Sequence, residues 1–310
     1  MLTAVHIVDA GGPHEKVTVE LMRRQRFFER MGVEATKTYV TNGAEAADML
    51  RLGRADVAMQ VGFGPALVAI ERGAQLRVVA GSNLLTVHAI YARRPDIRRL
   101  QDLQGRTVGV GKLGALTHQL IYAALLKHGV APATVRFVSI GNSATIFHAL
   151  LAGEVDAGFG ETDVFESQQH YGVHALENGV LWRELPEFPN QASFATVQAI
   201  EEKRTALVRT LAAHALLYRF LHSPDSRHEY AESWSTALPE SPQHDCAAQW
   251  SFYQTHHPFA ENLQLSEAQL TYMQNLNVTM KLQRRVLSFD AVTDLSLARD
   301  ALRLIDGVQS

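Results

Sequence analysis

Short apolar runs alternate with segments of helical pattern along the first 200 residues of the chain. Residues 5–8 (Val-His-Ile-Val) and 107–110 (Thr-Val-Gly-Val) have the β-branched character of strands, and each is followed by a loop and a helical pattern. The helical segments end at the glycine-containing turns 31–33 and 128–130. Strands that alternate with helices indicate parallel β-α-β units, so the predicted class is α/β.

Two segments of the chain, 41–56 and 141–156, are related at a constant offset of 100 residues. Five positions are identical in this register: Asn42 and Asn142, Ala44 and Ala144, Leu50 and Leu150, Gly53 and Gly153, and Asp56 and Asp156. In each copy a helix follows an Asn/Gly turn, a glycine stands where a left-handed C-cap is needed, and an apolar strand begins after the aspartate. A repeat of this length that occurs twice predicts two similar lobes.

Two apolar runs, 85–92 and 194–200, are placed to carry the chain into the second lobe and back again. We expect these crossings, near 86–92 and 194–200, to form a two-strand hinge. After residue 200 a long helical pattern covers 201–221, and further helical segments reach Gly307 without a third copy of the repeat. We interpret this region as helices that complete lobe one.

The length of 310 residues suits two lobes that each bury a core of their own. We expect lobe one to comprise residues 1–86 and 198–310, and lobe two to comprise residues 87–197. The formal net charge of −3 provides no field that would collect nucleic acid, so no nucleic-acid partner is expected.

The single cysteine, Cys246, excludes an internal disulfide and any cluster of cysteine metal ligands. No stretch approaches 18 uninterrupted apolar residues, the length that would indicate a membrane span. The N-terminus enters a strand at once and shows no secretion signal, so either the protein is cytosolic or a signal has been removed from it.

Three blocks of the sequence carry a resemblance to a known family: AADMLRLGRADVA at 46–58, LQDLQGRTVGV at 100–110 and ALLAGEVDA at 149–157. With them, the chain resembles the sulfonate/nitrate/taurine-type solute-binding proteins of bacterial ABC importers, a group that includes pyrimidine-precursor binders and fungal thiamine-pyrimidine synthases. The resemblance implies a periplasmic-binding-protein-like fold of type II, in which two α/β lobes enclose a ligand cleft. Residues 17–28 depart from the usual apolar pattern of the family.

The resemblance also implies a function, namely capture of a small organic molecule (a sulfonate, a carboxylate or a nitrogen heterocycle) for an ABC permease in the periplasm. We expect a monomer without a cofactor and without catalytic activity. The alternative is a cytosolic enzyme on the same scaffold, such as a pyrimidine-precursor synthase or a decarboxylase. The Cys-rich motif of the fungal synthases has no counterpart here, because Cys246 stands alone.

Ligands of open parallel sheets bind beyond the carboxyl ends of the strands, so the loops at these ends are the candidate binding site. In lobe one these loops contain Asp9, Gly11, Gly12, His14, Thr41, Asn42, Gln60, Gly62, Phe63, Ser82 and Asn83. In lobe two they contain Lys112, Leu113, Gly114, Thr117, Asn142, Glu161 and Asp163.

Some of these side chains suggest a ligand chemistry, and the suggestions conflict. His14, at a predicted helix N-terminus, and Lys112 would suit an anionic ligand, although each is equally compatible with an ordinary surface position. Glu161 and Asp163 would suit an amine or a hydrogen-bonding ring. Phe63 would stack on a planar ligand or pack beneath its loop. The sequence therefore leaves the charge of the ligand open.

No pattern of metal ligands or of catalytic residues stands out in the sequence. His256 and His257 are adjacent, and adjacent residues rarely point at one ion, so no metal site is predicted. Phosphate-loop, nucleophile-elbow and zinc-protease motifs are absent from the chain.

Overall fold

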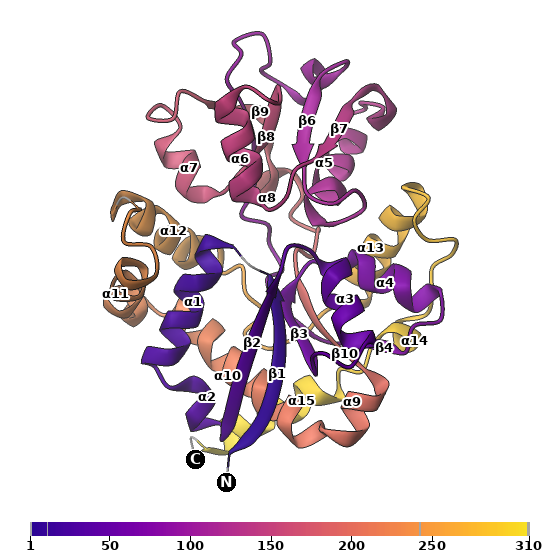
Figure 1. Cartoon of the computed structure of the whole chain (residues 1–310), viewed down its shortest axis with the longest axis vertical. Coiled ribbons are helices and arrows are strands. Elements are labelled where there is room, and N and C mark those ends of the chain that lie inside the picture. The colour runs from indigo at the N-terminus through magenta and orange to yellow at the C-terminus, as the bar shows by residue number, and fades with distance from the viewer. Residues whose placement is uncertain (1, 11, 242, 309–310) are drawn as a thin grey trace.

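The computed structural model describes residues 2–10, 12–241 and 243–308. The chain forms two α/β lobes that are stacked along its longest axis, as Figure 1 shows. Within the described residues, each lobe is built on an open five-stranded sheet flanked by helices. The predicted α/β class and the two-lobed architecture are therefore confirmed.

Lobe one has a sheet of strand order β2-β1-β3-β10-β4, in which β10 runs antiparallel to both of its neighbours. Its elements are β1 (Thr3–Ala10), α1 (Pro13–Arg24), α2 (Phe27–Arg30), β2 (Val33–Val40), α3 (Gly43–Arg51), β3 (Val57–Val61), α4 (Gly64–Glu71), β4 (Leu76–Gly81) and β10 (Ala192–Thr196). Every residue of β3 is buried, because strands lie on both sides of it and helices cover the sheet.

Lobe two repeats this arrangement with the strand order β7-β6-β8-β5-β9, and here β5 is the antiparallel strand. Its elements are β5 (Ala89–Ala92), β6 (Thr107–Val110), α5 (Leu116–Lys127), β7 (Arg136–Ser139), α6 (Ser143–Ala152), β8 (Ala157–Gly160), α7 (Thr162–Ser167), β9 (His174–Val180) and α8 (Leu181–Glu184). The antiparallel strand is fourth in each strand order, β10 in lobe one and β5 in lobe two. Each of these two strands lies next to a segment in which the chain crosses between the lobes.

The repeated residues of the sequence cap equivalent helices in the two lobes. The side chain of Asn42 accepts hydrogen bonds from backbone N–H groups in the first turn of α3, and that of Asn142 does the same for α6. Gly53 and Gly153 follow these helices with φ angles of 66° and 76°, a left-handed conformation that favours glycine. The offset of 100 residues therefore reflects two copies of one capped helix.

The repeated aspartates join β3 to β1 in lobe one and β8 to β6 in lobe two. Asp56 accepts a hydrogen bond from the backbone N–H of His6 at 2.9 Å, and its own N–H donates to the His6 carbonyl at 2.8 Å. Asp156 does the same with Thr107, at 2.8 Å and 2.9 Å. Each aspartate thereby fixes the register of the parallel strands β1 and β3, or β6 and β8.

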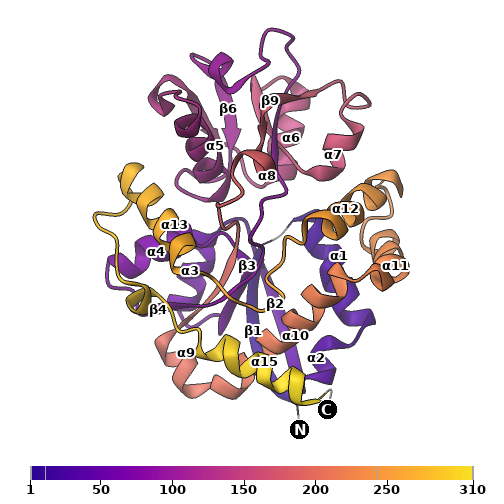
Figure 2. The same ribbon diagram turned by 180° about the vertical axis from the view of Figure 1, so that it is seen from behind.

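The C-terminal region is helical, as expected. Its elements are α9 (Val197–Glu202), α10 (Arg204–His222), α11 (Arg227–Ala237), α12 (Gln243–His256), α13 (Glu267–Thr279), α14 (Phe289–Val292) and α15 (Ser296–Val308). Helices α10 and α15 pack together across the back of the lobe-one sheet, as Figure 2 shows. Helix α12 also packs against α7, and α13 against α5, so this region contacts lobe two as well. None of the described helices is long and apolar enough to cross a membrane.

The return crossing between the lobes differs from the expected one. The expected hinge strand 194–200 overlaps β10 and α9, and β10 is paired with β3 and β4 inside the sheet of lobe one. The segment is apolar because it fills the middle of a buried sheet, rather than because it forms a hinge. The chain therefore leaves lobe one between Gly81 and Ala89, and it returns between Glu184 and Ala192.

Candidate ligand-binding site

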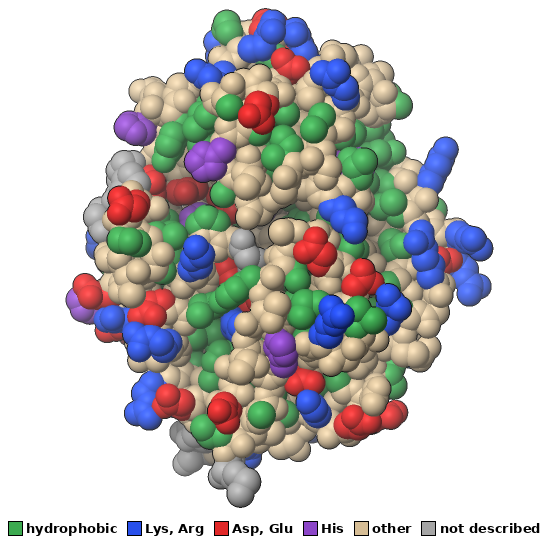
Figure 3. Space-filling model, viewed as in Figure 1, with side chains coloured by type: hydrophobic (Ala, Val, Ile, Leu, Met, Phe, Trp, Pro, Cys, Tyr) green, Lys and Arg blue, Asp and Glu red, His purple; other side chains and the backbone are tan. Residues whose placement is uncertain are grey.

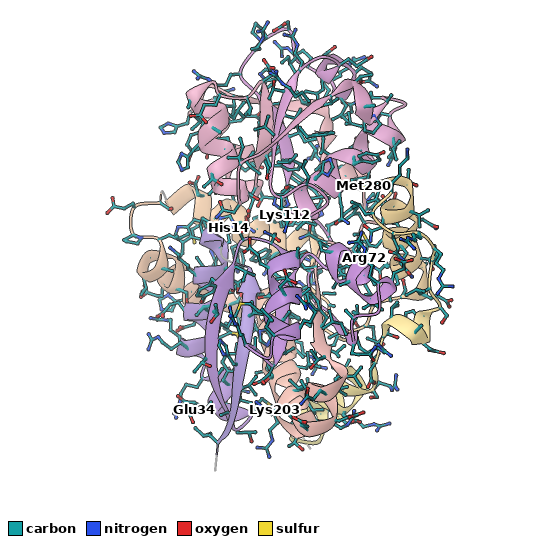
Figure 4. All side chains as sticks on the ribbon, turned by 45° about the vertical axis from the view of Figure 1, so that its right-hand side comes forward. His14, Glu34, Arg72, Lys112, Lys203 and Met280 are labelled. Atoms are coloured by element: carbon teal, nitrogen blue, oxygen red, sulfur yellow. The ribbon has the colours of Figure 1, made fainter. Side chains whose placement is uncertain are left out.

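A cavity of about 170 Å³ lies between the two lobes. Its wall is formed by the residues that follow β1, β3, β6 and β8, together with side chains from α12. The space-filling view in Figure 3 shows the surface hollowed at the same boundary between the lobes. Figure 4 places His14 and Lys112 at this boundary. The cavity therefore lies where the carboxyl-end rule for parallel sheets predicts a ligand.

Many of the predicted site residues line this cavity. They are Gly12, His14, Thr41, Asn42, Gln60, Gly62, Asn83, Lys112, Thr117, Asn142 and Glu161. Gly11 lies outside the described residues. The grouping brings together loops that are more than 100 residues apart in the chain.

Other predicted residues point away from the cavity. Phe63 is fully buried in the core, and Ser82 is buried with its hydroxyl 2.9 Å from that of Ser193. Leu113 is 56% exposed and, with Gly114, faces an outer groove of the protein. Strand ends predict where a loop lies, but they do not predict which side of the loop turns inward.

His14 joins the two lobes electrostatically. Its Nδ1 lies 2.6 Å from Glu161 and its Nε2 lies 3.5 Å from Asp163, and both carboxylates belong to lobe two. The imidazole ring also contacts Trp234 of α11, with the ring centroids 5.3 Å apart. Burial opposes the charge on this ring, but the two carboxylates outweigh it and raise the pKa of His14 well above its ordinary value. His14 is therefore an imidazolium that donates to Glu161.

The contact with His14 also changes the pKa of the Glu161 carboxylate. Burial alone would raise its pKa, but the positive charge and hydrogen bond of His14 lower the pKa of Glu161 to about 2. Of the two negative charges that the sequence places in the cleft, His14 thus compensates one, that of Glu161.

A second charge group lies beneath the lobe-one side of the cavity. Asp9 is fully buried and accepts a hydrogen bond at 2.8 Å from Lys37, whose Nζ also lies 3.7 Å from Glu15. Burial and the neighbouring Asp9 raise the pKa of Glu15 well above its ordinary value. Asp9 therefore supports the cavity wall from below, while Glu15 lines the cavity itself.

A histidine from the outward crossing reaches the cavity from the opposite side. The Nε2 of His88 lies 2.8 Å from the hydroxyl of Ser143, and its Nδ1 lies 2.9 Å from the hydroxyl of Thr86. Burial lowers the pKa of His88, and the nearby charge of His14 lowers it further, although Glu161 opposes this change. His88 is accordingly a neutral imidazole at neutral pH.

Buried polar atoms in the cavity wall lack hydrogen-bond partners among the described residues. They are Oε1 of Glu15, Oδ1 of Asn190 and Nε2 of Gln249. A buried polar group without a partner costs about 1–3 kcal/mol, and a ligand that supplies the partner recovers this free energy. Gln60, near the end of β3, has a φ angle of 50°. This left-handed backbone conformation is strained and uncommon for a residue other than glycine.

Helix N-termini from both lobes open on the same cavity. The wall includes the first residues of α3, α5 and α6, whose peptide dipoles present their positive ends to it. Helix α5 begins at Leu116, and its N-cap residue Ala115 provides no side-chain cap, so the first N–H groups of the helix are not used by a capping side chain. Lys112 lies in the same part of the wall. This part of the cavity favours a negatively charged group.

The lobes are in close contact on both sides of the cavity. Gln119 of α5 donates a hydrogen bond at 2.7 Å to Asn277 of α13, and Thr162 of α7 donates to Gln249 of α12. A Cβ atom on Gly62 would lie 2.8 Å from the Cβ of Leu116 in lobe two, which is closer than such atoms can approach. The structure is therefore a closed arrangement of the lobes.

Several residues in the cavity wall were not predicted from the sequence. They are Glu15, His88, Asn190, Gln191, Gln249, Tyr253 and Phe259, among others. Glu15 adjoins the predicted residue His14, so a wider loop would have included it. Gln249 and Tyr253 come from α12, and no sequence signal connects this helix with the strand ends of the two sheets.

Known structures share this fold over almost the entire chain. The most similar ones include a protein of Bordetella bronchiseptica (18% identity, TM-score 0.80, covering 98% of each chain). The alkanesulfonate-binding protein SsuA of Xanthomonas axonopodis, bound to MOPS, has 18% identity and a TM-score of 0.76, and the match covers 93% of this chain and 97% of SsuA. The nitrate-binding protein NrtA of Synechocystis has 13% identity and a TM-score of 0.76, covering 98% of this chain and 89% of NrtA.

The comparison of sequences gives the family. Curated protein sequences yielded no match. A family model described as the periplasmic substrate-binding protein of phosphonate ABC transporters matches residues 24–216, which is more than half of the chain. The expected relation to the binding proteins of ABC importers is thus confirmed, and the chain belongs to this family of periplasmic ABC-transporter substrate-binding proteins.

Proposed function

We propose that this protein captures a small organic molecule with one acidic group and presents it, in the closed arrangement, to an ABC permease. The observation that carries the proposal is the convergence of α3, α5 and α6 N-termini and Lys112 on one interlobe cavity. Anionic groups are stabilised at helix N-termini by the free N–H groups and by the helix dipole. Contacts from both lobes to one ligand would favour closure over the open form.

Ion pairs within the protein support an anionic ligand, because they reduce the negative charge that such a ligand would meet. Glu161 is neutralised by His14, and Asp9 is paired with Lys37. The raised pKa of Glu15 favours its neutral acid form, which also donates a hydrogen bond. An acidic ligand group near Lys112 would therefore meet a favourable potential.

The buried polar atoms without a hydrogen-bond partner indicate which further groups the ligand would carry besides its acidic group. Gln249 offers an N–H donor and Asn190 offers a carbonyl acceptor, each buried in the wall. A ligand with both an acceptor and a donor group, such as a sulfonate, carboxylate or phosphonate that also carries an amine or an amide, would satisfy both. The names of SsuA and NrtA, an alkanesulfonate binder and a nitrate binder, support an anionic ligand.

A thermal-shift screen tests this assignment. The panel pairs alkyl sulfonates, carboxylates and phosphonates with their neutral amides and alcohols, and it adds nitrate and free pyrimidines. Because a ligand that binds only the folded protein raises its melting temperature, an acid from the panel is expected to stabilise the protein more than its neutral counterpart. Lys112→Ala should weaken binding of that acid by about ten- to a hundredfold, or about 1–3 kcal/mol.

Lys16→Ala is the matched control, because Lys16 is an exposed lysine of α1 that does not line the cavity. Equal losses in the two variants would show that only the general field of the protein matters. Stabilisation by a neutral heterocycle and by none of the acids would refute the anionic ligand. If no compound of any class stabilised the protein, the binding function itself would lose its support.

Partners and location follow from the family. We propose a periplasmic protein that works as a monomer with an ABC permease, and the described structure holds the cavity within one chain. The enzymatic alternative has one observation in its favour, the 2.8 Å contact between His88 and the hydroxyl of Ser143 in the cavity wall. Labelling of Ser143 by a sulfonyl fluoride, followed by mass spectrometry, would reveal an activated serine there. If Ser143 were not labelled, the enzymatic alternative would lose its support, and binding would remain as the proposed function.

A further inference from the structure

A cluster of three metal-ligating side chains lies outside the interlobe cavity. It consists of His222 at the end of α10 with His257 and Glu261 in the segment between α12 and α13. One possible ligand atom of each residue lies within 4.8 Å of the other two. His222 Nδ1 is hydrogen-bonded to Oε1 of Glu261, and Nδ1 of His257 lies 3.8 Å from the same oxygen. Three donors thus point at one small volume.

We propose that this cluster binds a divalent transition-metal ion of the zinc type. Zinc takes imidazole nitrogens and carboxylate oxygens at about 2.0–2.2 Å in tetrahedral sites, and two histidines with one glutamate form a known ligand set. A zinc ion would take the place between Nδ1 of His222 and Oε1 of Glu261 that the ring proton now occupies, and this proton would move to Nε2 of His222. Glu261 is 42% exposed as a side chain, so it has room to move the short distance that an intervening ion requires.

The surroundings suit a partly open metal site. The side chain of His222 is 3% exposed and that of His257 is 57% exposed, so one ligand is held rigidly while the other faces solvent. The open side leaves space for water as a fourth ligand. The ring centroids of His222 and His257 lie 4.5 Å apart.

The backbone holds His257 in place beside its partners. His257 has a φ angle of 45°, an uncommon left-handed conformation for this residue type, at the position where α12 ends. The neighbouring His256 turns the other way and contacts Phe252, with ring centroids 4.6 Å apart. The sequence argument that adjacent histidines diverge therefore agrees with the geometry, while the partners of His257 are Glu261, four residues further along the same segment, and His222 at the end of α10.

The cluster is connected to the cavity through one backbone amide. Nε2 of His222 accepts a long hydrogen bond of 3.3 Å from the N–H of Phe259, and Phe259 lines the interlobe cavity. Coordination of the metal by Nδ1 requires the ring proton to move to Nε2, so this hydrogen bond is given up. Metal binding should therefore change the environment of the Phe259 amide.

Titration of the tag-free protein with Zn²⁺ by calorimetry tests the proposal. We expect saturable binding of one ion and a raised melting temperature, with Mg²⁺ as a hard cation that gives neither. His257→Ala and Glu261→Gln should each weaken Zn²⁺ binding by about tenfold or more, and their metal-free stability should change little because both residues are well exposed. His256→Ala is the matched control and should bind as the unaltered protein does.

Two results would overturn the site. One is the absence of saturable Zn²⁺ binding to the unaltered protein. The other is an equal loss in the His256 and His257 variants, which would assign the zinc to the histidines of the surface in general. As an independent reading, an NMR titration should shift the Phe259 amide in the unaltered protein but not in Glu261→Gln.

Discussion

A single histidine links the charges of the two lobes. His14 lies in lobe one, in the first turn of α1, while Glu161 and Asp163 lie just after β8 in lobe two. Because the contact exists only while the lobes are together, its free energy contributes to the closed arrangement and not to either lobe alone. The ion pair thus acts as a bond across the cleft.

The pKa values of this pair predict a dependence on pH. The raised pKa of His14 means that its contribution is complete below its ordinary value of 6.5 and is lost as the pH rises through the raised pKa. The lowered pKa of Glu161 means that its contribution is complete above 4.5 and is lost as the pH falls through about 2. The pair should therefore stabilise the closed protein most between about pH 4.5 and pH 6.5.

His14→Gln isolates this contribution. The difference in unfolding free energy between the unaltered protein and the variant should be greatest in that pH range and should shrink toward alkaline pH. Chemical denaturation at a series of pH values measures it, and His128→Gln, a histidine paired with Glu184 inside lobe two, serves as the control. A difference that does not vary with pH would contradict the assigned pairing.

The candidate site was predictable at the residue level only as far as strand ends define it. The rule for parallel sheets located His14, Lys112 and Glu161, since each follows a strand by a few residues. It could not show that the charges of His14 and Glu161 cancel, because that depends on a distance between residues 147 positions apart. Gln249 escaped prediction because its helix reaches the cavity by packing against α7, which is a tertiary event.

At the level of the elements, the repeated aspartate of lobe two should stabilise that lobe by holding β8 against β6. Asp156→Ala removes the acceptor for the backbone N–H of Thr107, which lies in a buried strand. A hydrogen bond to a charged group contributes about 1.5–3 kcal/mol, and the loss should appear in urea unfolding. Glu154→Ala controls for loss of a carboxylate from lobe two, because Glu154 is exposed. An unchanged unfolding midpoint in Asp156→Ala would mean that the register of β6 and β8 is fixed by other contacts.

Elements of the repeat were predictable because local signals define them. An Asn cap, a glycine with positive φ and an aspartate after the helix each act within a few residues. The strand β10 was misplaced because an apolar run has the same composition in a hinge as in the centre of a sheet. Only its pairing with both β3 and β4 distinguishes the two, and these partners lie more than 100 residues earlier.

At the scale of the whole molecule, the close approach of the two lobes depends on Gly62, which has no side chain to meet Leu116 of the other lobe. Gly62→Ala would place a methyl group against Leu116, so the closed arrangement should become less favourable while each lobe remains folded. Small-angle scattering should show a larger radius of gyration for this variant. Gly12→Ala is the control, because a Cβ atom at Gly12 meets nothing within 4 Å and this residue lines the same cavity. Identical scattering of the two variants would show that the contact does not limit closure.

The position of β10 affects the order in which the protein is completed during synthesis. The strands of lobe two occupy one continuous stretch, 89–180, whereas the sheet of lobe one lacks the strand between β3 and β4 until residues 192–196 have been made. As the chain leaves the ribosome, lobe two therefore has all its strands first, although lobe one begins first. Until then the first 81 residues carry unpaired strand edges, which are sites of aggregation. The strands β1 to β4, which are made before those of lobe two, thus wait longer for the strand that completes their sheet.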